Sequence, residues 1–346
     1  MQETKKIRIL SLDGGGIRGI ISCVVLQYLE QLLQKEDPEA KIGDYFDLIA
    51  GSSTGGIIAA IVLVPGPDHK SKFSIDTALA LYAERGYDIF KVSTWSKIWN
   101  PFGLLDERIS AKNLERQLLD FFEDLRLSEL CKPCLITSYD LFNRKAVFFN
   151  SHTAKDPMRN FYVKDVCRAT SAAPTYFEPA RIFSEFGKSY DLIDGGVYAN
   201  NPALCAYAEA RKIPFSQVLK DPKKPDYPTA KDILLVSVGT GAVDKPYLLD
   251  RLKKKGKIGW ISPLIDILLS ANVETVDYQC EALYQSLGAE GNRLYYRLTP
   301  GLHKADGAMD NSKAGNISAL KQAALAYIQQ NQKTLELLAS ELRKNQ

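Results

Sequence analysis

The sequence predicts a single α/β domain in which a mostly parallel central sheet is covered by helices on both faces. Two observations lead to this prediction. Short apolar runs typical of buried strands alternate with segments whose apolar residues have helical spacing, and the first two strands each end in a glycine-rich turn. Strands that alternate with helices favour parallel pairing, because each helix carries the chain back to the end of the sheet where the previous strand began, and the next strand then runs in the same direction. The 346 residues are 45% apolar and 25% charged, which is enough apolar material for a large core.

The elements follow in chain order from these patterns. Strands are predicted at Ile7–Leu12, Phe46–Ala50, Cys134–Tyr139, Ala146–Asn150, Tyr190–Ile193, Ile233–Val238 and Leu294–Leu298. Helices are predicted between Ile21 and Leu32, and at Ile57–Leu63, Thr77–Ala83, Ala111–Phe122, Val163–Thr170, Pro202–Lys212 and Ser262–Ser286. One apolar stripe from Ile317 to Leu342 predicts a long helix, or two helices with a break near Asn331, docked on the core. The only weak seams, Asp221–Pro228 and Asp244–Lys257, are not convincing linkers, so residues 1–346 are interpreted as one domain.

The charge balance and the hydropathy of the sequence lead us to expect neither a nucleic-acid-binding nor a membrane-spanning protein. Lys and Arg number 44 against 41 Asp and Glu, so the net charge of +3 predicts no nucleic-acid partner. No charged and then apolar leader precedes Ile7, and the longest apolar run, Ile57–Val64, is far shorter than the roughly 20 residues of a membrane span. We expect a soluble, cytoplasmic protein, for which peripheral membrane contact or non-classical export stays open.

The six cysteines include a Cys131-Lys-Pro-Cys134 pair with redox or metal spacing. No second pair or neighbouring histidine completes a zinc site, so reduced thiols packed at a strand start are the favoured interpretation. Neither a metal nor a cofactor is predicted.

The first glycine-rich turn, Gly14–Gly19, fits the pattern G-x-G-x-x-G between a strand and a helix. A dinucleotide site would also need an acidic residue at the end of the second strand, but Glu36 and Asp37 precede that strand. The exposed N–H groups of consecutive glycines suit an oxyanion hole equally well. A tight turn without a ligand is the third alternative.

The second turn, Gly51–Gly55, fits G-x-S-x-G at a strand-to-helix turn and makes Ser53 a candidate nucleophile. Serine needs a base, and histidines are scarce: His69 and His303 lie in polar loops, and only His152, after a strand, could join a triad. Surface positions are the favoured interpretation for all three. The strand that ends at Asp194 offers a carboxylate base instead, and an Asp that caps its own turn is the alternative.

Taken together and in this order, these pieces resemble the patatin-like phospholipases. The residues that carry the resemblance are Asp13–Gly19, Gly51–Gly56 and Asp194–Gly196, supported by Asp44–Ala50, Ala169–Phe177 and Leu235–Gly241. The likeness extends from about residue 7 to residue 242, and the helical part from about residue 243 to residue 346 is expected to pack on this core. One departure is that close plant members often carry Asp-Gly-Ala where this chain has Asp194-Gly195-Gly196, a change expected to preserve activity.

The resemblance implies a three-layer α/β/α sandwich and a lipid acyl hydrolase, a phospholipase A-type serine esterase. It implies a Ser53–Asp194 dyad without a catalytic histidine, no metal, and an oxyanion hole at Gly14, Gly15 and Gly16 with Arg18 beside it. Phospholipids or galactolipids would be cleaved through an acyl-enzyme. Acyl transfer, hydrolysis of small esters only, and binding of a nucleotide or lipid without chemistry are the rival functions.

Two segments carry residues suited to a lipid surface. A basic run, Arg251–Lys257, precedes Trp260, and Trp95, Trp99, Phe102, Leu104 and Leu105 form an apolar cluster that would border an acyl groove. A solvated loop and local core packing explain them equally well, so neither is assigned as a site.

Overall fold

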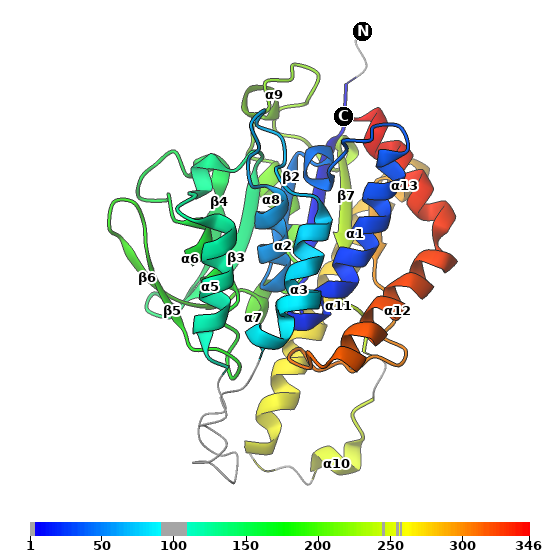
Figure 1. Cartoon of the computed structure of the whole chain (residues 1–346). Coiled ribbons are helices and arrows are strands. Elements are labelled where there is room, and N and C mark those ends of the chain that lie inside the picture. Colours follow the sequence, from blue (N-terminus) through cyan, green and yellow to red (C-terminus); the bar gives the residue numbers. More distant parts are fainter. Residues whose placement is uncertain (1–3, 91–108, 244–245, 254–255, 257) are drawn as a thin grey trace.

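A central sheet lies between two layers of helices in the computed structural model, which describes residues 4–90, 109–243, 246–253, 256 and 258–346 (Figure 1). The predicted three-layer α/β/α arrangement is therefore confirmed. The apolar cluster between Trp95 and Leu105 lies outside the described residues.

The eight-stranded sheet has a parallel centre and an antiparallel edge. Its parallel strands, in spatial order, are β3 (Cys134–Asp140), β2 (Leu48–Gly51), β1 (Ile7–Leu12), β7 (Ile233–Val238) and β8 (Tyr295–Leu298). The other three, β4 (Lys145–Asn150), β6 (Ser189–Asp194) and β5 (Ala180–Phe183), pair antiparallel beyond β3. The sheet is thus mostly parallel, as predicted.

Alternate residues of β1 face the two helical layers, as the two-residue period of a strand requires. Leu10 and Leu12 pack in the larger core cluster, and Ile7 and Ile9 pack in the smaller one. The first layer contains α1 (Gly19–Gln34), α2 (Thr54–Val62), α3 (Ile75–Ile89), α5 (Ala111–Phe122), α6 (Val163–Thr170), α12 (Ala314–Gln330) and α13 (Gln332–Lys344). The second contains α8 (Ala203–Ala210), α9 (Phe215–Val218) and α11 (Ile261–Gln285), and the short α7 (Gly196–Ala199) and α10 (Leu249–Lys253) precede α8 and α11 in the chain.

Among the described residues, one helical segment, Gly16–Gln34, is long and apolar enough to span a membrane by length and composition alone. Its apolar window is 78% buried inside the protein, and Figure 1 shows this segment, which includes α1, packed among the other helices. The apolar character of α1 is that of a core helix.

The predicted strands correspond to β1–β4 and β6–β8, with bounds within two residues of those observed. Of the two alternatives for the apolar stripe from Ile317 to Leu342, the structure has the second, two helices with a break at Asn331, since α12 ends at Gln330 and α13 begins at Gln332. The sequence pattern missed β5, whose four residues alternate between buried and exposed and pair only with β6. Such a short edge strand lacks the apolar run that marks the others.

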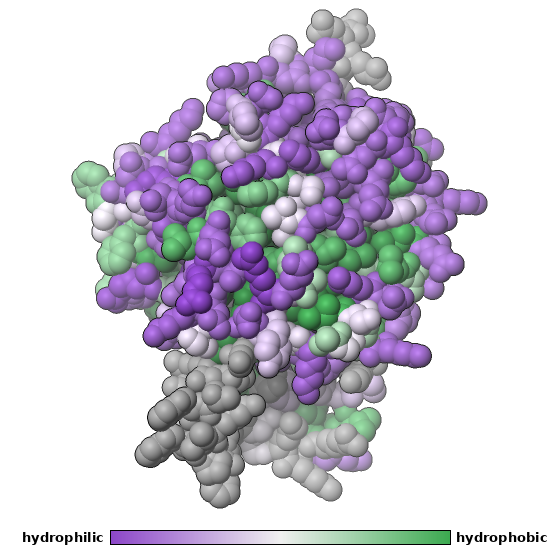
Figure 2. All heavy atoms as spheres, viewed as in Figure 1, coloured by the Kyte–Doolittle hydropathy of each residue, from purple (hydrophilic) through white to green (hydrophobic). Residues whose placement is uncertain are grey.

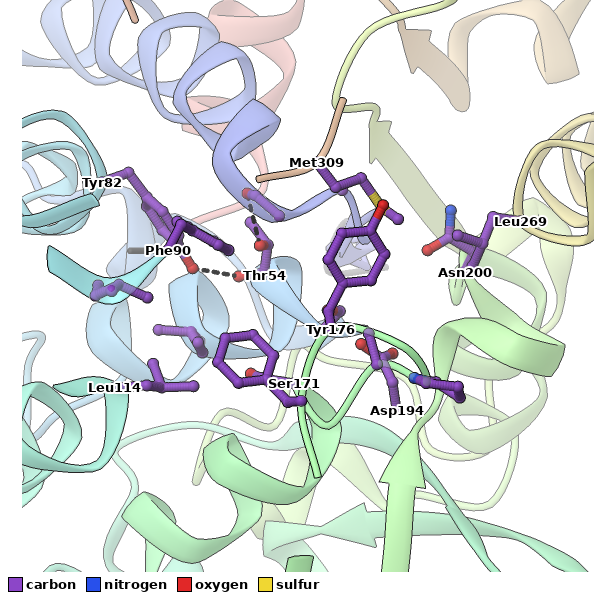
Figure 3. A pocket seen from close by; sticks show the side chains of 18 of the residues that line it. Thr54, Tyr82, Phe90, Leu114, Ser171, Tyr176, Asp194, Asn200, Leu269 and Met309 are labelled. Carbon is purple, nitrogen blue, oxygen red and sulfur yellow. Dashed lines mark hydrogen bonds between the residues drawn. The ribbon is translucent and has the colours of Figure 1, made fainter. Parts of the chain in front are cut away.

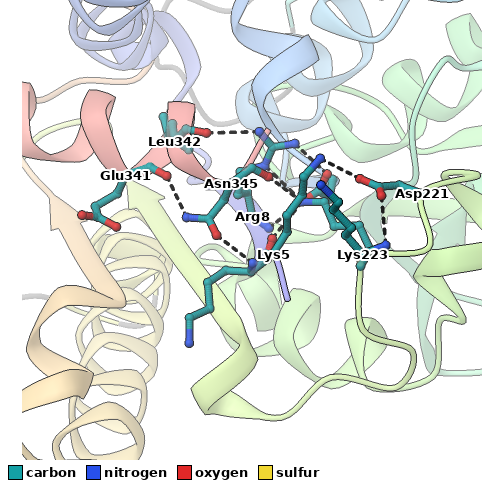
Figure 4. A network of polar contacts seen from close by, with 10 residues as sticks. Lys5, Arg8, Asp221, Lys223, Glu341, Leu342 and Asn345 are labelled. Atoms are coloured by element: carbon teal, nitrogen blue, oxygen red, sulfur yellow. Dashed lines mark hydrogen bonds and ion pairs between the residues drawn. The ribbon is translucent and has the colours of Figure 1, made fainter. Parts of the chain in front are cut away.

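A buried ionic network ties β1 to the C-terminal helix (Figure 4). Arg8 donates from Nη2 and Nε to the two carboxylate oxygens of Asp47, at 2.9 and 3.1 Å, and from Nη1 to the Leu342 carbonyl. Lys224 Nζ contacts the same carboxylate at 2.6 Å and donates to the Asn345 carbonyl. Burial opposes ionisation of Asp47, but the two cations hold its pKa below the usual value. One carboxylate thus holds two buried cations.

Asp47→Asn is expected to destabilise the fold by about 3–5 kcal/mol, because it leaves two buried cations without their counter-ion. Urea unfolding followed by circular dichroism measures this loss. The matched control is Asp221→Asn, which removes the partly exposed Lys5–Asp221 pair, 2.9 Å apart, and is expected to cost less than about 1 kcal/mol. Equal losses in the two variants would contradict the account of the network.

Candidate active site

The register of β3 explains how the ends of β2 and β6 meet. One edge of β3 is occupied by β4 from Leu135 to Asp140, so β2 and β6 share the opposite edge. Gly51, the last residue of β2, lies opposite Ile136, and Asp194, the last residue of β6, lies opposite Ser138. Because the two strands run toward each other, their C-terminal ends are only about 7 Å apart along β3.

Ser53 stands on a sharp turn between β2 and α2. Its backbone has φ 52° and ψ −125°, a strained conformation for a residue with a side chain, as a nucleophile elbow requires. Its N–H donates to Thr170 Oγ1 at 2.9 Å, and that hydroxyl donates to the Thr137 carbonyl at 2.7 Å. A Cβ on Gly55 would lie 2.1 Å from the Leu12 carbonyl oxygen, so the last glycine of the motif permits close approach to β1. These hydrogen bonds and this close packing hold the backbone of the turn that carries Ser53 in place.

Asp194 lies beside Ser53 and is 4% exposed. Its Oδ1 accepts the Gly196 N–H at 2.7 Å, and its own N–H donates to the Ala172 carbonyl. Burial raises the pKa of Asp194 to about 7, and hydrogen bonding with the Ser53 hydroxyl and with the Gly196 N–H opposes that rise. A carboxylate with a pKa near neutrality is a far better proton acceptor than an exposed aspartate.

The glycine turn after β1 reaches the same place from the other side. The Gly14 N–H donates to the Asn200 carbonyl at 3.0 Å and is therefore occupied. Gly15 and Gly16 line the Ser53 pocket, and within the described part of the chain neither N–H has a hydrogen-bond acceptor. The side chain of Arg18 is buried, and its Nε lies 3.4 Å from the Gly15 carbonyl oxygen. Two of the three predicted N–H groups thus remain available for an oxyanion.

The turn is anchored by an ion pair that the sequence patterns did not indicate. Arg297 on β8 forms a bidentate ion pair with Asp13, in which Nη2 donates to Oδ2 at 2.6 Å and Nη1 donates to Oδ1 at 3.1 Å. Nη1 also donates to Ser237 Oγ at 2.7 Å. Both side chains are largely buried, so the geometry suits the strong, bidentate form of this interaction. Asp13 thereby fixes the start of the glycine turn against the sheet.

Gly15→Ala is expected to lower kcat for ester hydrolysis by about 10²–10³, the loss typical of one misplaced oxyanion donor. The added Cβ would lie 2.2 Å from Thr240 Oγ1 and 2.6 Å from Thr240 Cβ, so the turn would have to shift. Gly315→Ala, in α12 with nothing within 4 Å, is the matched control and is expected to retain activity. Unchanged turnover in the first variant would argue against a role for this turn.

Ser53 and Asp194 open into an apolar pocket (Figure 3). On one side Tyr82 and Phe90 from α3 and its end approach Leu114 of α5, and the rings of Phe90 and Phe177 lie 6.4 Å apart. Figure 3 places Tyr176, Met309 and Leu269 on the other side, near Asp194 and Asn200. The pocket is therefore a mainly hydrocarbon-lined space with its polar groups gathered at Ser53.

A second, more polar cleft adjoins this pocket and shares Tyr176, Ile265 and Met309 with it. Asp266, His303 and Asp306 line it, and Tyr247 donates a hydrogen bond to Asp266. A ligand that extends beyond the apolar pocket thus meets carboxylates and hydroxyls.

All three histidines lie in the described part of the chain, and none lines the Ser53 pocket. His152, the one triad candidate, has a side chain only 10% exposed and places Nε2 3.2 Å from Glu209 Oε1 on α8. His303 is exposed in the second cleft, and His69 is exposed with φ 55°. The expected surface position thus holds for His69 and His303, whereas His152 forms a largely buried pair.

The six cysteines all lie in the described part of the chain and are free thiols. Cys134, the first residue of β3, is a buried free thiol, and Cys131, three residues before the strand, is a half-buried one. Among the described residues, no group of three or more potential ligands is placed to hold a metal ion.

Comparison with known proteins shows the family to which the chain belongs. The sequence profile described as patatin-like phospholipase matches residues 10–207, which include the glycine turn, the elbow and Asp194. The chain belongs to the patatin-like phospholipase family. Family membership supports a lipid acyl hydrolase in general terms.

The patatin-like chain is similar along almost its whole length to plant proteins. It is 31% identical to patatin-like protein 2 of Oryza sativa subsp. indica, covering 97% of this chain and 87% of the relative. It is 32% identical to patatin-like protein 4 of Arabidopsis thaliana, with coverage of 91% and 81%. A Solanum tuberosum relative, 31% identical with 83% and 77% coverage, is named "Probable inactive patatin-3-Kuras 1". Activity must therefore be argued from the residues of each chain.

A solved structure, VipD from Legionella pneumophila, aligns with 93% of this patatin-like chain and 67% of its own. The TM-score is 0.37 and the sequence identity 12%, too distant a likeness to bear on substrate or mechanism.

Proposed function

We propose that the protein is a lipid acyl hydrolase in which Ser53 is the nucleophile and Asp194 the general base. The observation that carries this proposal is the meeting of a serine on a strained elbow and a buried carboxylate of raised pKa in one apolar pocket. A carboxylate that only capped its own turn would not need to face a nucleophile.

Acylation begins when Ser53 Oγ attacks the ester carbonyl carbon and its proton passes to Asp194. The negative charge that develops on the carbonyl oxygen is placed at the N–H groups of Gly15 and Gly16, with the positive end of the α2 dipole nearby. As the carbon–oxygen bond breaks, Asp194 returns the proton to the departing alcohol or lysolipid. The acyl group remains on Ser53.

Deacylation repeats these steps with water. Asp194 accepts a proton from a water molecule, which attacks the acyl–Ser53 carbonyl, and then returns that proton to Ser53 Oγ. A fatty acid leaves and the dyad is restored.

The apolar pocket and the polar cleft beside it suit different parts of a lipid substrate. The hydrocarbon wall made by Leu81, Phe90, Leu114 and Phe177 suits an acyl chain. The polar cleft beyond Tyr176 suits the glycerol and headgroup of the leaving lysolipid. This arrangement favours lipid over small esters, because a short acyl group would leave the apolar wall unfilled.

The pKa of Asp194 predicts the pH dependence. Only the ionised carboxylate accepts a proton, so kcat/KM for a soluble ester is expected to fall about tenfold per pH unit below about 7 and to level off above it. Initial rates between pH 5 and pH 9, at constant ionic strength, measure the profile. A rate that stays level down to pH 5 would contradict a base of raised pKa.

Product analysis tests the proposed function. The protein is incubated with vesicles of phosphatidylcholine and, separately, of galactolipid, and the products are identified by mass spectrometry. Free fatty acid with a matching lysolipid supports hydrolysis. Fatty-acyl esters of an added alcohol in place of free acid would indicate an acyltransferase, and lipid binding without any product would indicate a binding protein.

A further inference from the structure

The exposed apolar residues of the described chain include a cluster at the end of the molecule where α10 and the beginning of α11 lie (Figure 1). We give the name docking face to seven of them, each 37–64% exposed: Tyr247, Leu248, Leu249, Trp260, Ile261, Leu264 and Leu268. Figure 2 has hydrophobic residues at the place that α10 occupies in Figure 1. Tyr247 joins the two elements through its hydrogen bond to Asp266 on α11, and exposed apolar residues gathered at one end of a molecule in this way mark an interaction site.

The docking face is continuous with the wall of the catalytic pocket. At about 100° per residue, Leu264, Leu268, Ile261, Ile265 and Leu269 follow one another around α11 as a single stripe about 140° wide. Ile261, Leu264 and Leu268 are about half exposed, whereas Ile265 and Leu269 line the pocket that holds Ser53. The same helix thus carries hydrocarbon from the outer surface into the site.

The chemistry around the docking face complements a phospholipid surface. Lys253 is exposed on α10. In the sequence it belongs to a basic run that begins at Arg251, continues with Lys254, Lys255 and Lys257, and ends just before Trp260. Apolar residues that alternate with cations and an aromatic are typical of segments that lie in the interface of a bilayer with anionic lipid. A protein partner would not explain why the stripe leads into an acyl-binding pocket.

We infer that the docking face inserts into the surface of a phospholipid bilayer and delivers an acyl chain directly along α11 to Ser53. This inference rests on the proposed lipid hydrolysis. It adds where the protein meets the membrane and which residues do so.

The test compares two triple variants in vesicle co-sedimentation. Ile261→Gln/Leu264→Gln/Leu268→Gln alters the docking face without touching the pocket lining. Leu119→Gln/Leu325→Gln/Leu337→Gln changes leucines that are 46–49% exposed on α5, α12 and α13 and serves as the matched control. With vesicles of phosphatidylcholine and phosphatidylglycerol, the docking-face variant is expected to bind at least about tenfold more weakly than the wild type. The control is expected to bind as the wild type does.

Hydrolysis of a short-chain ester below its micelle concentration separates this inference from the proposed function. The docking-face variant is expected to keep wild-type kcat/KM on the soluble ester and to lose rate on vesicles. If no variant hydrolyses any ester, the proposed function fails while the binding comparison still stands. If the soluble ester is cleaved but vesicle binding is equal in all variants, only the docking inference is overturned.

A single variant and a measurement of the oligomeric state complete the experiment. Should the triple variant fail to fold, the single change Leu264→Gln is expected to weaken vesicle binding in the same direction with soluble-ester activity retained. Light scattering reports the oligomeric state. A wild-type dimer that the docking-face variant dissociates would assign the surface to a second copy of the chain and would overturn the inference.

Discussion

Ser53→Ala is expected to lower kcat for ester hydrolysis by about 10⁴–10⁶, to the level supported by the oxyanion donors alone. Without Oγ no acyl-enzyme can form, and the strained turn around residue 53 holds no second nucleophile in the same position. Initial rates on a soluble ester and fatty-acid release from vesicles measure the loss.

The neighbouring residue provides the control. Ser52 is fully buried, and its hydroxyl has no hydrogen-bond partner among the described residues, so Ser52→Ala removes a hydroxyl from the same motif without touching the pocket lining. It is expected to keep most of the activity. A similar loss in both variants would mean that the turn itself, and not the Ser53 hydroxyl, is what matters.

Asp194→Asn is expected to lower kcat by about 10⁴, comparable to the loss of the orienting carboxylate in serine protease triads. The amide has nearly the same shape but cannot accept the Ser53 proton. Because burial raises the pKa of Asp194, its ionised form at pH 8 lowers the stability of the folded protein. The variant should therefore unfold at a denaturant concentration no lower than the wild type, so lost activity would not reflect lost fold.

A second aspartate on the same strand serves as the comparison. Asp191 is paired with Arg181 at the surface, so Asp191→Asn is expected to leave turnover unchanged. Full activity in Asp194→Asn, or equal losses in the two aspartate variants, would contradict the assignment of Asp194 as the base.

The parts of the site that the sequence predicted are those built from local geometry. A strand, a sharp turn and a helix are encoded within a few residues, so Ser53 could be placed on an elbow from its neighbours alone. Asp194 was found in the same way, at the end of a strand before two glycines. The sheet order then brings the two together through their shared neighbour β3.

The parts that the sequence could not predict depend on partners far along the chain. Arg297 holds Asp13 from 284 residues away, and no local pattern around it indicates that role. The Asn200 carbonyl occupies the Gly14 N–H, which separates Gly14 from Gly15 and Gly16 within one run of glycines. The pocket wall comes from α3, α5 and α11, whose apolar residues look like ordinary core positions until the fold assembles them.

The histidines illustrate the same limit. Their positions in the sequence predicted loops and surfaces, yet His152 pairs with Glu209, which lies 57 residues further along the chain. None of the three lines the Ser53 pocket. This placement supports the proposal that Asp194 is the base.

Covalent labelling tests the dyad most directly. The wild-type protein is treated with a fluorophosphonate at pH 8, and the modified peptide is located by mass spectrometry. The dyad predicts a single adduct on Ser53, absent in Ser53→Ala, greatly slowed in Asp194→Asn and unchanged when His69, His152 and His303 are all replaced. Labelling at another residue, or labelling of Ser53 that is lost on replacing His152 in a folded protein, would contradict it.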